Sequence, residues 1–148
     1  MAPVEEDLHA TVAARLRRVG QRYTPARRAV VDALVEAPAP VTTAQLVAAR
    51  PSLPQSTTYR NLAVLEQAGV VHRVMSGDDF ARFELSEELA GHHHHLVCVS
   101  CGGVEDFTPP AQLERSLASV VGRVTTGTGF RAESHRLDLL GTCGACAG

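Results

Sequence analysis

Four cysteines in the last third of the chain form two Cys-x-x-Cys pairs, Cys98 with Cys101 and Cys143 with Cys146. This spacing lets one tight turn present two thiolates, and four thiolates in a tetrahedral array are typical ligands of structural zinc. A redox dithiol or an iron–sulfur cluster would use the same residues, but no redox-fold pattern accompanies them. The pairs therefore predict a Zn²⁺ site that ties the end of the chain back to an earlier strand.

Four consecutive histidines, His92 to His95, precede the first cysteine pair by three residues. Successive side chains of a β-strand point to opposite faces, so His93 and His95 would share one face and His92 and His94 the other. Neutral imidazoles bind borderline divalent metals. A surface loop is the alternative for such a tract, but its place beside the thiolates favours at least one metal site.

Charge is distributed unevenly along a chain whose net charge is −2. Between residues 15 and 73 there are nine arginines and only three carboxylates, Asp32, Glu36 and Glu66. This segment predicts a surface for a polyanion such as DNA, although a solvated arginine face would have the same composition. We find no apolar run that could cross a bilayer and no signal-peptide pattern, so we expect a cytoplasmic protein with no membrane partner.

The first half of the chain has the pattern of a winged helix-turn-helix. Apolar spacing predicts helices over about residues 5–18, 25–36, 44–50 and 56–69, and Thr24-Pro25 and Gly69 provide end signals. Alternating residues over 70–76 and 80–86 flank Gly-Asp-Asp and predict a two-stranded hairpin. The helix over 56–69 would enter the major groove of DNA as the recognition helix.

The second half predicts a small α/β unit. Residues 86–92 have the composition of a linker, and they are followed by strands over 94–100 and 102–107, a helix over about 110–121 and a long strand over 130–141. That last strand would leave apolar surface for a second copy. We therefore predict an α+β protein with a winged-helix DNA-binding domain (1–85), a hinge linker (86–92) and a dimerisation and metal-binding domain (93–148).

The sequence resembles the ferric uptake regulator family over essentially its whole length. The resemblance rests on the order and spacing of Arg22-Tyr-Thr-Pro-Ala-Arg27, Thr58-Tyr59-Arg60, Phe83-Glu84-Leu85, the histidine run leading into Cys98-x-x-Cys101-Gly102, and the closing cysteine pair. It implies a homodimeric regulator that binds a palindromic operator in double-stranded DNA. It also implies that Cys98, Cys101, Cys143 and Cys146 hold a structural zinc ion.

The resemblance further implies two histidine sites. A regulatory site at the hinge would use His93 and His95 with Glu84, Asp106 and His72. A further site on the other strand face would use His92, His94, Glu114 and His135. Ordinary solvated roles are the alternative for Glu84, His72 and His135.

The metal of the hinge site is a separate question. Pro40 stands where iron-type members have a histidine, whereas His72 resembles a ligand position of zinc-uptake regulators, and both points favour Zn²⁺. Glu84 stands near a position where some zinc sensors have a cysteine. Fe²⁺, Ni²⁺ or Mn²⁺ as effector, and peroxide sensing, therefore remain alternatives.

The expected DNA contacts lie at the start of the recognition helix. The hydroxyls of Ser56, Thr57 and Thr58 can bond phosphates, Tyr59 can pack on a thymine methyl, and Arg60 can reach guanine or phosphate. A core role is the alternative for Tyr59, because it shares helical spacing with Leu62. By resemblance, Arg22 would enter the minor groove.

We expect a metal-dependent repressor of metal-homeostasis genes, with no enzymatic activity and no small-molecule substrate. An ion bound across the hinge would favour one spacing of the two recognition helices. A metallohydrolase would need an open coordination position and a general base, and the sequence has no HExxH motif. A metal-storage protein would bind the ion without responding to DNA.

Overall fold

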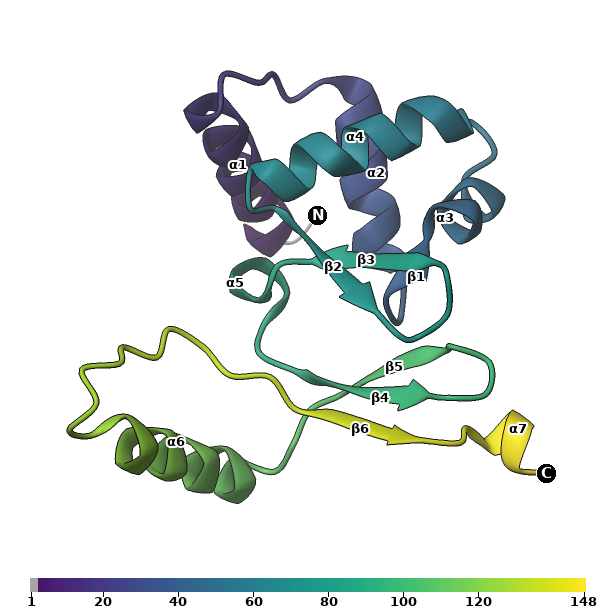
Figure 1. Cartoon of the computed structure of the whole chain (residues 1–148). Coiled ribbons are helices and arrows are strands. Elements are labelled where there is room, and N and C mark those ends of the chain that lie inside the picture. Colours follow the sequence, from purple (N-terminus) through teal and green to yellow (C-terminus); the bar gives the residue numbers. More distant parts are fainter. Residues whose placement is uncertain (1–2) are drawn as a thin grey trace.

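The computed structural model describes residues 3–148 and has the predicted α+β class (Figure 1). Its N-terminal half contains four helices and a small sheet. The helices are α1 (Pro3–Arg18), α2 (Pro25–Glu36), α3 (Thr43–Ala49) and α4 (Gln55–Gln67). The strands β1 (Val41–Thr42), β2 (Val71–Met75) and β3 (Ala81–Leu85) form an antiparallel sheet in the order β1-β3-β2, in which the β2–β3 hairpin is the wing.

Local signals fix the helix starts. The Thr24 hydroxyl accepts a hydrogen bond from the Arg27 backbone N–H, and Pro25 occupies the first turn of α2. Thr42 and Gln45 form a reciprocal capping box that begins α3. These caps orient the helices around one buried core, made of Val12, Leu16, Val30, Val31, Leu34, Leu46, Leu62, Leu65, Val70 and Phe83.

The segment between the two sheets contains a short helix, α5 (Glu87–Ala90), where the sequence predicted only a linker. Leu89 of this helix packs against the N-terminal core. The Arg15 guanidinium donates hydrogen bonds to the Gly69 carbonyl at 2.6 Å and to the Ser86 hydroxyl at 3.3 Å. The start of the connecting segment is therefore held on the N-terminal half.

A second three-stranded sheet carries the C-terminal half. Strand β4 (His94–Cys98) pairs antiparallel with β5 (Val104–Phe107) and parallel with β6 (Asp138–Gly141). Helix α6 (Ala111–Thr125) lies between β5 and β6 in sequence, and α7 (Gly144–Ala147) follows β6. Figure 1 shows the wing between the N-terminal helices and this sheet.

The predicted strand over 130–141 is wrong in its first two thirds. Only residues 138–141 are a strand, and they pair with His95 to Cys98 of β4. The alternating residues before it do not bury a face, and Phe130 is 68% exposed. Helix α6, in contrast, continues to Thr125, beyond the predicted end near residue 121.

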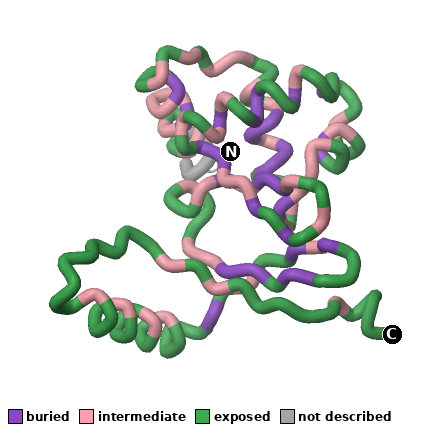
Figure 2. Tube along the Cα trace, in the orientation of Figure 1, coloured by how far each residue is buried: buried purple, intermediate pink, exposed green. Residues whose placement is uncertain are grey.

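Burial differs sharply between the two halves (Figure 2). No residue of α6 or β6 is buried, and apolar side chains on both elements are exposed, including Val120, Val124, Leu139 and Leu140. An apolar surface of this kind indicates a protein partner. Among the described residues, no helix is long and apolar enough to cross a membrane.

Candidate metal centres and DNA-binding face

The two cysteine pairs meet in space although 42 residues separate Cys101 from Cys143. Cys98 ends β4, Cys101 lies in the turn after it, and Cys143 and Cys146 lie at the start of α7 and within it. The four sulfurs lie within 4.8 Å of one another, and the Sγ atoms of Cys101 and Cys143 are 3.9 Å apart. Tetrahedral Zn–S bonds of about 2.3 Å require sulfurs about 3.8 Å apart, so this cluster fits zinc.

The backbone prepares these thiols to act as ligands. The Cys143 N–H donates to the Cys98 sulfur at 3.3 Å, and the Gly103 N–H donates to the Cys101 sulfur at 3.4 Å. Backbone N–H groups of Cys101 and Cys143 lower the pKa of Cys98 to about 6. A thiolate is the form that binds a metal ion.

A second cluster joins the wing to the C-terminal sheet. Glu84 comes from β3 and Asp106 from β5. His93 directly precedes β4, and His95 is the second residue of β4. The Glu84 carboxylate lies 2.9 Å from His93 Nε2 and 3.0 Å from His95 Nε2, and Asp106 Oδ1 lies 3.5 Å from His95 Nε2. One ligand atom from each residue lies within 4.8 Å of the others. We call these four residues the hinge cluster.

The hinge cluster presents its ring nitrogens in a state suited to an ion. His93 Nδ1 lies 2.9 Å from the Gly91 carbonyl, which can only accept, so Nδ1 carries a proton, and Nε2, which faces Glu84, is the nitrogen placed to bind an ion. Burial opposes the charge on Glu84, but the hydrogen bonds from His95 and His93 lower its pKa overall. Burial raises the pKa of Asp106, and the Glu84 charge adds to this.

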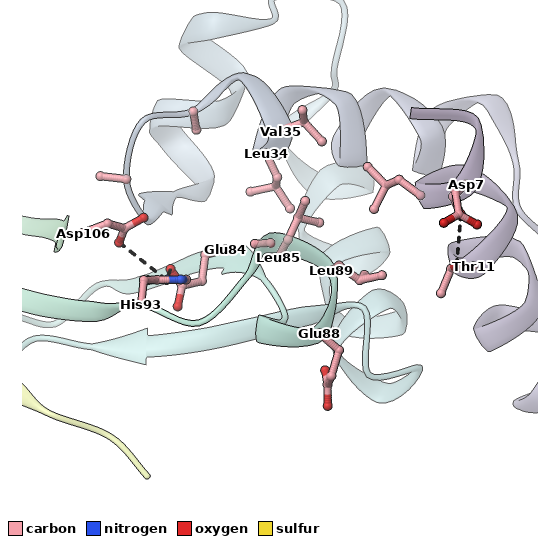
Figure 3. Close-up of a pocket in the computed structure, with 14 residues that line it drawn as sticks. Asp7, Thr11, Leu34, Val35, Glu84, Leu85, Glu88, Leu89, His93 and Asp106 are labelled. Atoms are coloured by element: carbon pink, nitrogen blue, oxygen red, sulfur yellow. Dashed lines mark hydrogen bonds and ion pairs between the residues drawn. The ribbon is translucent and has the colours of Figure 1, made fainter. Parts of the chain in front are cut away.

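The hinge cluster borders a cavity of about 430 Å³ (Figure 3). Glu84, His93 and Asp106 lie at one end, Leu34, Val35 and Leu89 of α2 and α5 line the middle, and Asp7 and Thr11 of α1 lie at the other end. The cluster is therefore accessible from the space between the two halves of the chain.

A third cluster uses the other two histidines. His92 and His94 meet Glu114 of α6 and His135, again with all four ligand atoms within 4.8 Å. Glu114 lies 2.5 Å from His94 Nε2, 3.0 Å from His92 Nε2 and 3.1 Å from His135 Nε2. We call this the second cluster. The alternation along the histidine run thus separates the four rings as the sequence predicted.

His72 is placed differently from its expected role. It lies opposite Glu84 in the β2–β3 register, on the wall of a cavity of about 220 Å³ that also borders His93 and His95. Its ring is not part of the four-residue hinge cluster. The geometry therefore gives no support to His72 as a ligand of that cluster.

The residues expected to contact DNA in the first turns of α4 lie at least partly on the surface, with one exception. Ser56, Tyr59 and Arg60 are exposed and line a shallow surface hollow, and Thr57 is half-buried. Tyr59 is 56% exposed, which argues against a core role, whereas Thr58 is only 1% exposed and faces the core. Thr58 therefore does not lie on the surface that DNA could contact. Arg22 is exposed in the loop before α2.

Comparison with known proteins now decides the family. The model of the ferric uptake regulator family matches residues 18–140. The chain belongs to the ferric uptake regulator family. It is 32% identical to the peroxide operon regulator of Bacillus subtilis over 138 residues, which cover 89% of this chain and 88% of that protein.

Solved structures of this family have the same fold. The ferric uptake regulator of Helicobacter pylori matches with a TM-score of 0.75 over 97% of this chain and 93% of that one, at 20% identity. The manganese-containing structure of the Pseudomonas aeruginosa ferric uptake regulator matches with a TM-score of 0.68 at 27% identity, over 88% of this chain and 96% of that one.

Membership of the ferric uptake regulator family confirms the predicted class of protein. Members are metal-responsive transcription regulators and not enzymes, and they bind DNA operators as dimers. The exposed apolar residues of α6 and β6 are consistent with such a dimer.

Two polar neighbours of the clusters were not anticipated from the sequence. Glu87 of α5 contacts His92 Nδ1, and Asp138 of β6 lies 3.5 Å from His95 Nδ1. A carboxylate on the far nitrogen of a metal-ligating histidine orients the ring and raises its basicity. Asp138 could have been anticipated from a correct β4–β6 register, but Glu87 is brought in by the turn at Gly91, for which the sequence has no specific signal.

Proposed function

We propose that this chain is a metal-dependent DNA-binding repressor of metal-homeostasis genes, and that Glu84, His93, His95 and Asp106 hold its regulatory ion. The proposal rests on the observation that the four candidate ligands come from both halves of the chain. Glu84 belongs to the wing, whereas the other three residues belong to the C-terminal half. An ion shared by these residues links the DNA-binding half directly to the other half of the chain.

The linkage acts by shifting a population. The wing continues directly from α4, so fixing Glu84 relative to β4 also fixes the recognition helix relative to the C-terminal half. In a homodimer, this sets the spacing of two recognition helices on a palindromic operator. The ion acts only through its higher affinity for the closed arrangement, and such couplings are typically about 1–3 kcal/mol.

We propose Zn²⁺ as the first candidate for the regulatory ion. Sites with imidazole and carboxylate ligands bind Zn²⁺ more tightly than Fe²⁺ or Mn²⁺ in the usual order of affinities. Four converging ligands also match the coordination number that zinc prefers. The support that the sequence drew from His72 is weaker, because His72 lies outside the cluster.

Peroxide sensing through Fe²⁺ is the second candidate. The hinge cluster contains no sulfur, and two histidines with carboxylates form a ligand set typical of non-haem Fe²⁺ sites. The similarity to a regulator named for the peroxide operon supports the same reading. In this case peroxide would weaken the metal-loaded repressor on its operator.

Three further assignments complete the proposal. The four cysteines hold structural Zn²⁺, and the second cluster, His92, His94, Glu114 and His135, is a candidate further metal site. Arg22, Ser56, Thr57, Tyr59 and Arg60 contact the DNA. We place the domain boundaries at residues 85 and 92–93, with α5 inside the hinge, and we propose that the protein acts on DNA in the cytoplasm.

The test is a titration of DNA affinity with metal. Operator DNA is first selected from a random palindromic library, and protein holding only its structural zinc is then titrated anaerobically with Zn²⁺, Fe²⁺, Mn²⁺ and Ni²⁺. We expect one ion to raise the affinity by about 5- to 150-fold. Loss of that gain on adding peroxide to the Fe²⁺ form, but not to the Zn²⁺ form, identifies the peroxide sensor. If no ion raises the affinity, the proposal fails, and a storage role replaces it.

A further inference from the structure

The two halves of the chain also meet at a second place, away from the hinge cluster. Val74 of the wing packs with Val97 of β4 and Val104 of β5, and the three side chains form a small buried cluster with exposures of 1%, 5% and 6%. Val74 comes from the N-terminal sheet and the other two from the C-terminal sheet. The side of the wing that faces away from the N-terminal core is therefore covered by the C-terminal sheet.

A charged pair accompanies these valines. Arg82 on β3 is only 7% exposed, and its two terminal nitrogens each lie 2.9 Å from one oxygen of Asp78 in the wing turn. Arg82 also donates to the Ser76 hydroxyl at 2.7 Å. A buried guanidinium that donates two parallel hydrogen bonds to a carboxylate holds that carboxylate in a fixed position. The wing turn is therefore a rigid surface.

The Asp78 carboxylate lies directly against the turn that contains Cys101 and Gly102. Gly102 follows Cys101 directly and has a φ of +75°, a conformation that favours glycine. A Cβ at Gly102 would lie 3.0 Å from the Asp78 Cβ and 2.6 Å from its Cγ, so no larger residue fits. The Gly102 N–H meanwhile donates to the Cys98 carbonyl at 2.9 Å and closes the turn. The wing thus rests on backbone that also shapes the cysteine cluster.

The charge of the wing turn supports contact with protein more than with DNA. Its tip carries Asp78 and Asp79 and no basic residue. Carboxylates here would be repelled by phosphates, whereas wings that grip DNA present Lys or Arg.

We propose that the contact between the wing, at Asp78 and Arg82, and the cysteine turn, at Gly102, is a second joint of the regulator, that is, a second point at which the two halves of the chain are held together. The inference rests on the proposed function and extends it to a further element of control. One joint at the hinge cluster leaves the wing free to rotate, whereas two joints fix its orientation. The shape of the cysteine turn therefore helps to set the position of the recognition helix.

Two substitutions test the joint, each with a matched control. Asp78→Ala removes the side chain that touches Gly102, and Asp79→Ala changes its exposed neighbour. Gly102→Ala adds a methyl group against Asp78. Gly127→Ala is its control, because Gly127 has a φ of +78° in the same half of the chain with nothing within 4 Å. Gly127→Ala therefore introduces the same backbone strain without obstructing the wing.

The first readout is the shape of the protein that holds only its structural zinc, measured by small-angle X-ray scattering. We expect Asp78→Ala and Gly102→Ala to expand the molecule and both controls to leave it unchanged. Because no regulatory ion is present, this result does not depend on the hinge cluster. Unchanged scattering in Asp78→Ala would overturn the second joint and leave the proposed function standing.

The second readout is DNA affinity with the regulatory ion saturating. We expect about a tenfold loss for Asp78→Ala and for Gly102→Ala, and less than twofold for the controls. The double variant should lose little more than either single variant, because both substitutions remove the same contact. Fully additive losses would contradict the proposal. Zinc content measured in parallel shows whether Gly102→Ala has disturbed the cysteine cluster. If it has, the result for Asp78→Ala, which lies outside that cluster, decides the test.

Discussion

The two histidine clusters are built from four consecutive residues, yet they connect different parts of the molecule. His93 and His95 face Glu84 of the wing, whereas His92 and His94 face Glu114 and His135 of the C-terminal half. Both clusters have four ligand atoms at similar spacing. What separates them is where the remaining ligands come from, and only the hinge cluster can transmit the presence of an ion from one half to the other.

The clusters also differ in where their protons lie. His93 Nδ1 donates to the Gly91 carbonyl, so an ion that displaces the proton between His93 Nε2 and Glu84 leaves an ordinary neutral ring with its proton on Nδ1. His94 Nδ1 instead accepts from the Leu137 N–H at 3.2 Å, so the neutral ring carries its proton on Nε2, against Glu114. An ion on His94 Nε2 would therefore remove the single proton of the neutral ring, whereas an ion on His93 Nε2 would not. We therefore expect the hinge cluster to bind metal first and the second cluster to act mainly in stability.

Replacing the carboxylate of each cluster with alanine should show this difference most strongly. We expect Glu84→Ala to abolish the metal-induced gain in DNA affinity, a loss of about 5- to 150-fold, because the wing loses its link to the ion. Glu114→Ala should change the gain by less than about threefold, since Glu114 lies outside the hinge. Fluorescence anisotropy on operator DNA, with and without metal, measures both. Equal losses in the two variants would show that the clusters are not distinct.

For folding stability, we expect substitutions in the second cluster to have a larger effect than substitutions in the hinge cluster. His94 is 1% exposed and bonded to both Glu114 and the Leu137 N–H, so His94→Ala removes a buried ring, leaves the half-buried Leu137 N–H without this partner and takes one of three histidine partners from Glu114. We expect a loss of about 1–3 kcal/mol in the free energy of unfolding by urea, with structural zinc present. His93→Ala should lose less, because its side chain is partly exposed. A larger loss for His93→Ala would contradict the structural role given to the second cluster.

Acid should weaken metal binding at the hinge cluster. The Glu84 hydrogen bond raises the pKa of His95, and it raises that of His93 although burial opposes the shift. Without an ion, this raised pKa adds stability at low pH that is lost as pH rises through it. An ion needs the neutral rings, so affinity should fall as pH drops through the raised pKa, by up to about tenfold per pH unit for each proton displaced. Calorimetry in two buffers with different ionisation enthalpies counts the released protons, and an affinity unchanged by acid would contradict the assigned ligands.

The smallest effect is expected at His72. Its ring borders the neighbouring cavity but lies outside the hinge cluster. His72→Ala should therefore change hinge-site metal affinity by less than about twofold, within the range of ordinary surface substitutions. A loss as large as that of His95→Ala would restore His72 as a ligand and strengthen the case for zinc.

Features encoded locally could be predicted from the sequence. The alternation of the four histidines follows from strand geometry alone, and the two cysteine turns follow from their spacing. Thr24-Pro25 marks the start of α2 because the cap and the first turn are adjacent in sequence. The ligands contributed from distant elements, Glu84 and Glu114, were reached through the family resemblance.

Features that depend on packing were missed or misplaced. The buried face of α4 runs through Thr58, Asn61, Leu62 and Leu65, but two of these are polar, so the helical phase that buries Thr58 was obscured. Asn61 is tolerated there because its side chain accepts from Arg27. The contact between Asp78 and Gly102 joins two surface turns and leaves no mark in hydrophobic periodicity.

The central claim is tested most directly by dividing the histidine run in two. One variant replaces His93 and His95 with alanine and the other replaces His92 and His94, and operator affinity is measured for each with and without the regulatory metal. The account predicts that the first variant loses its response to metal while the second keeps it within about threefold. A metal response that survives without His93 and His95 would contradict it.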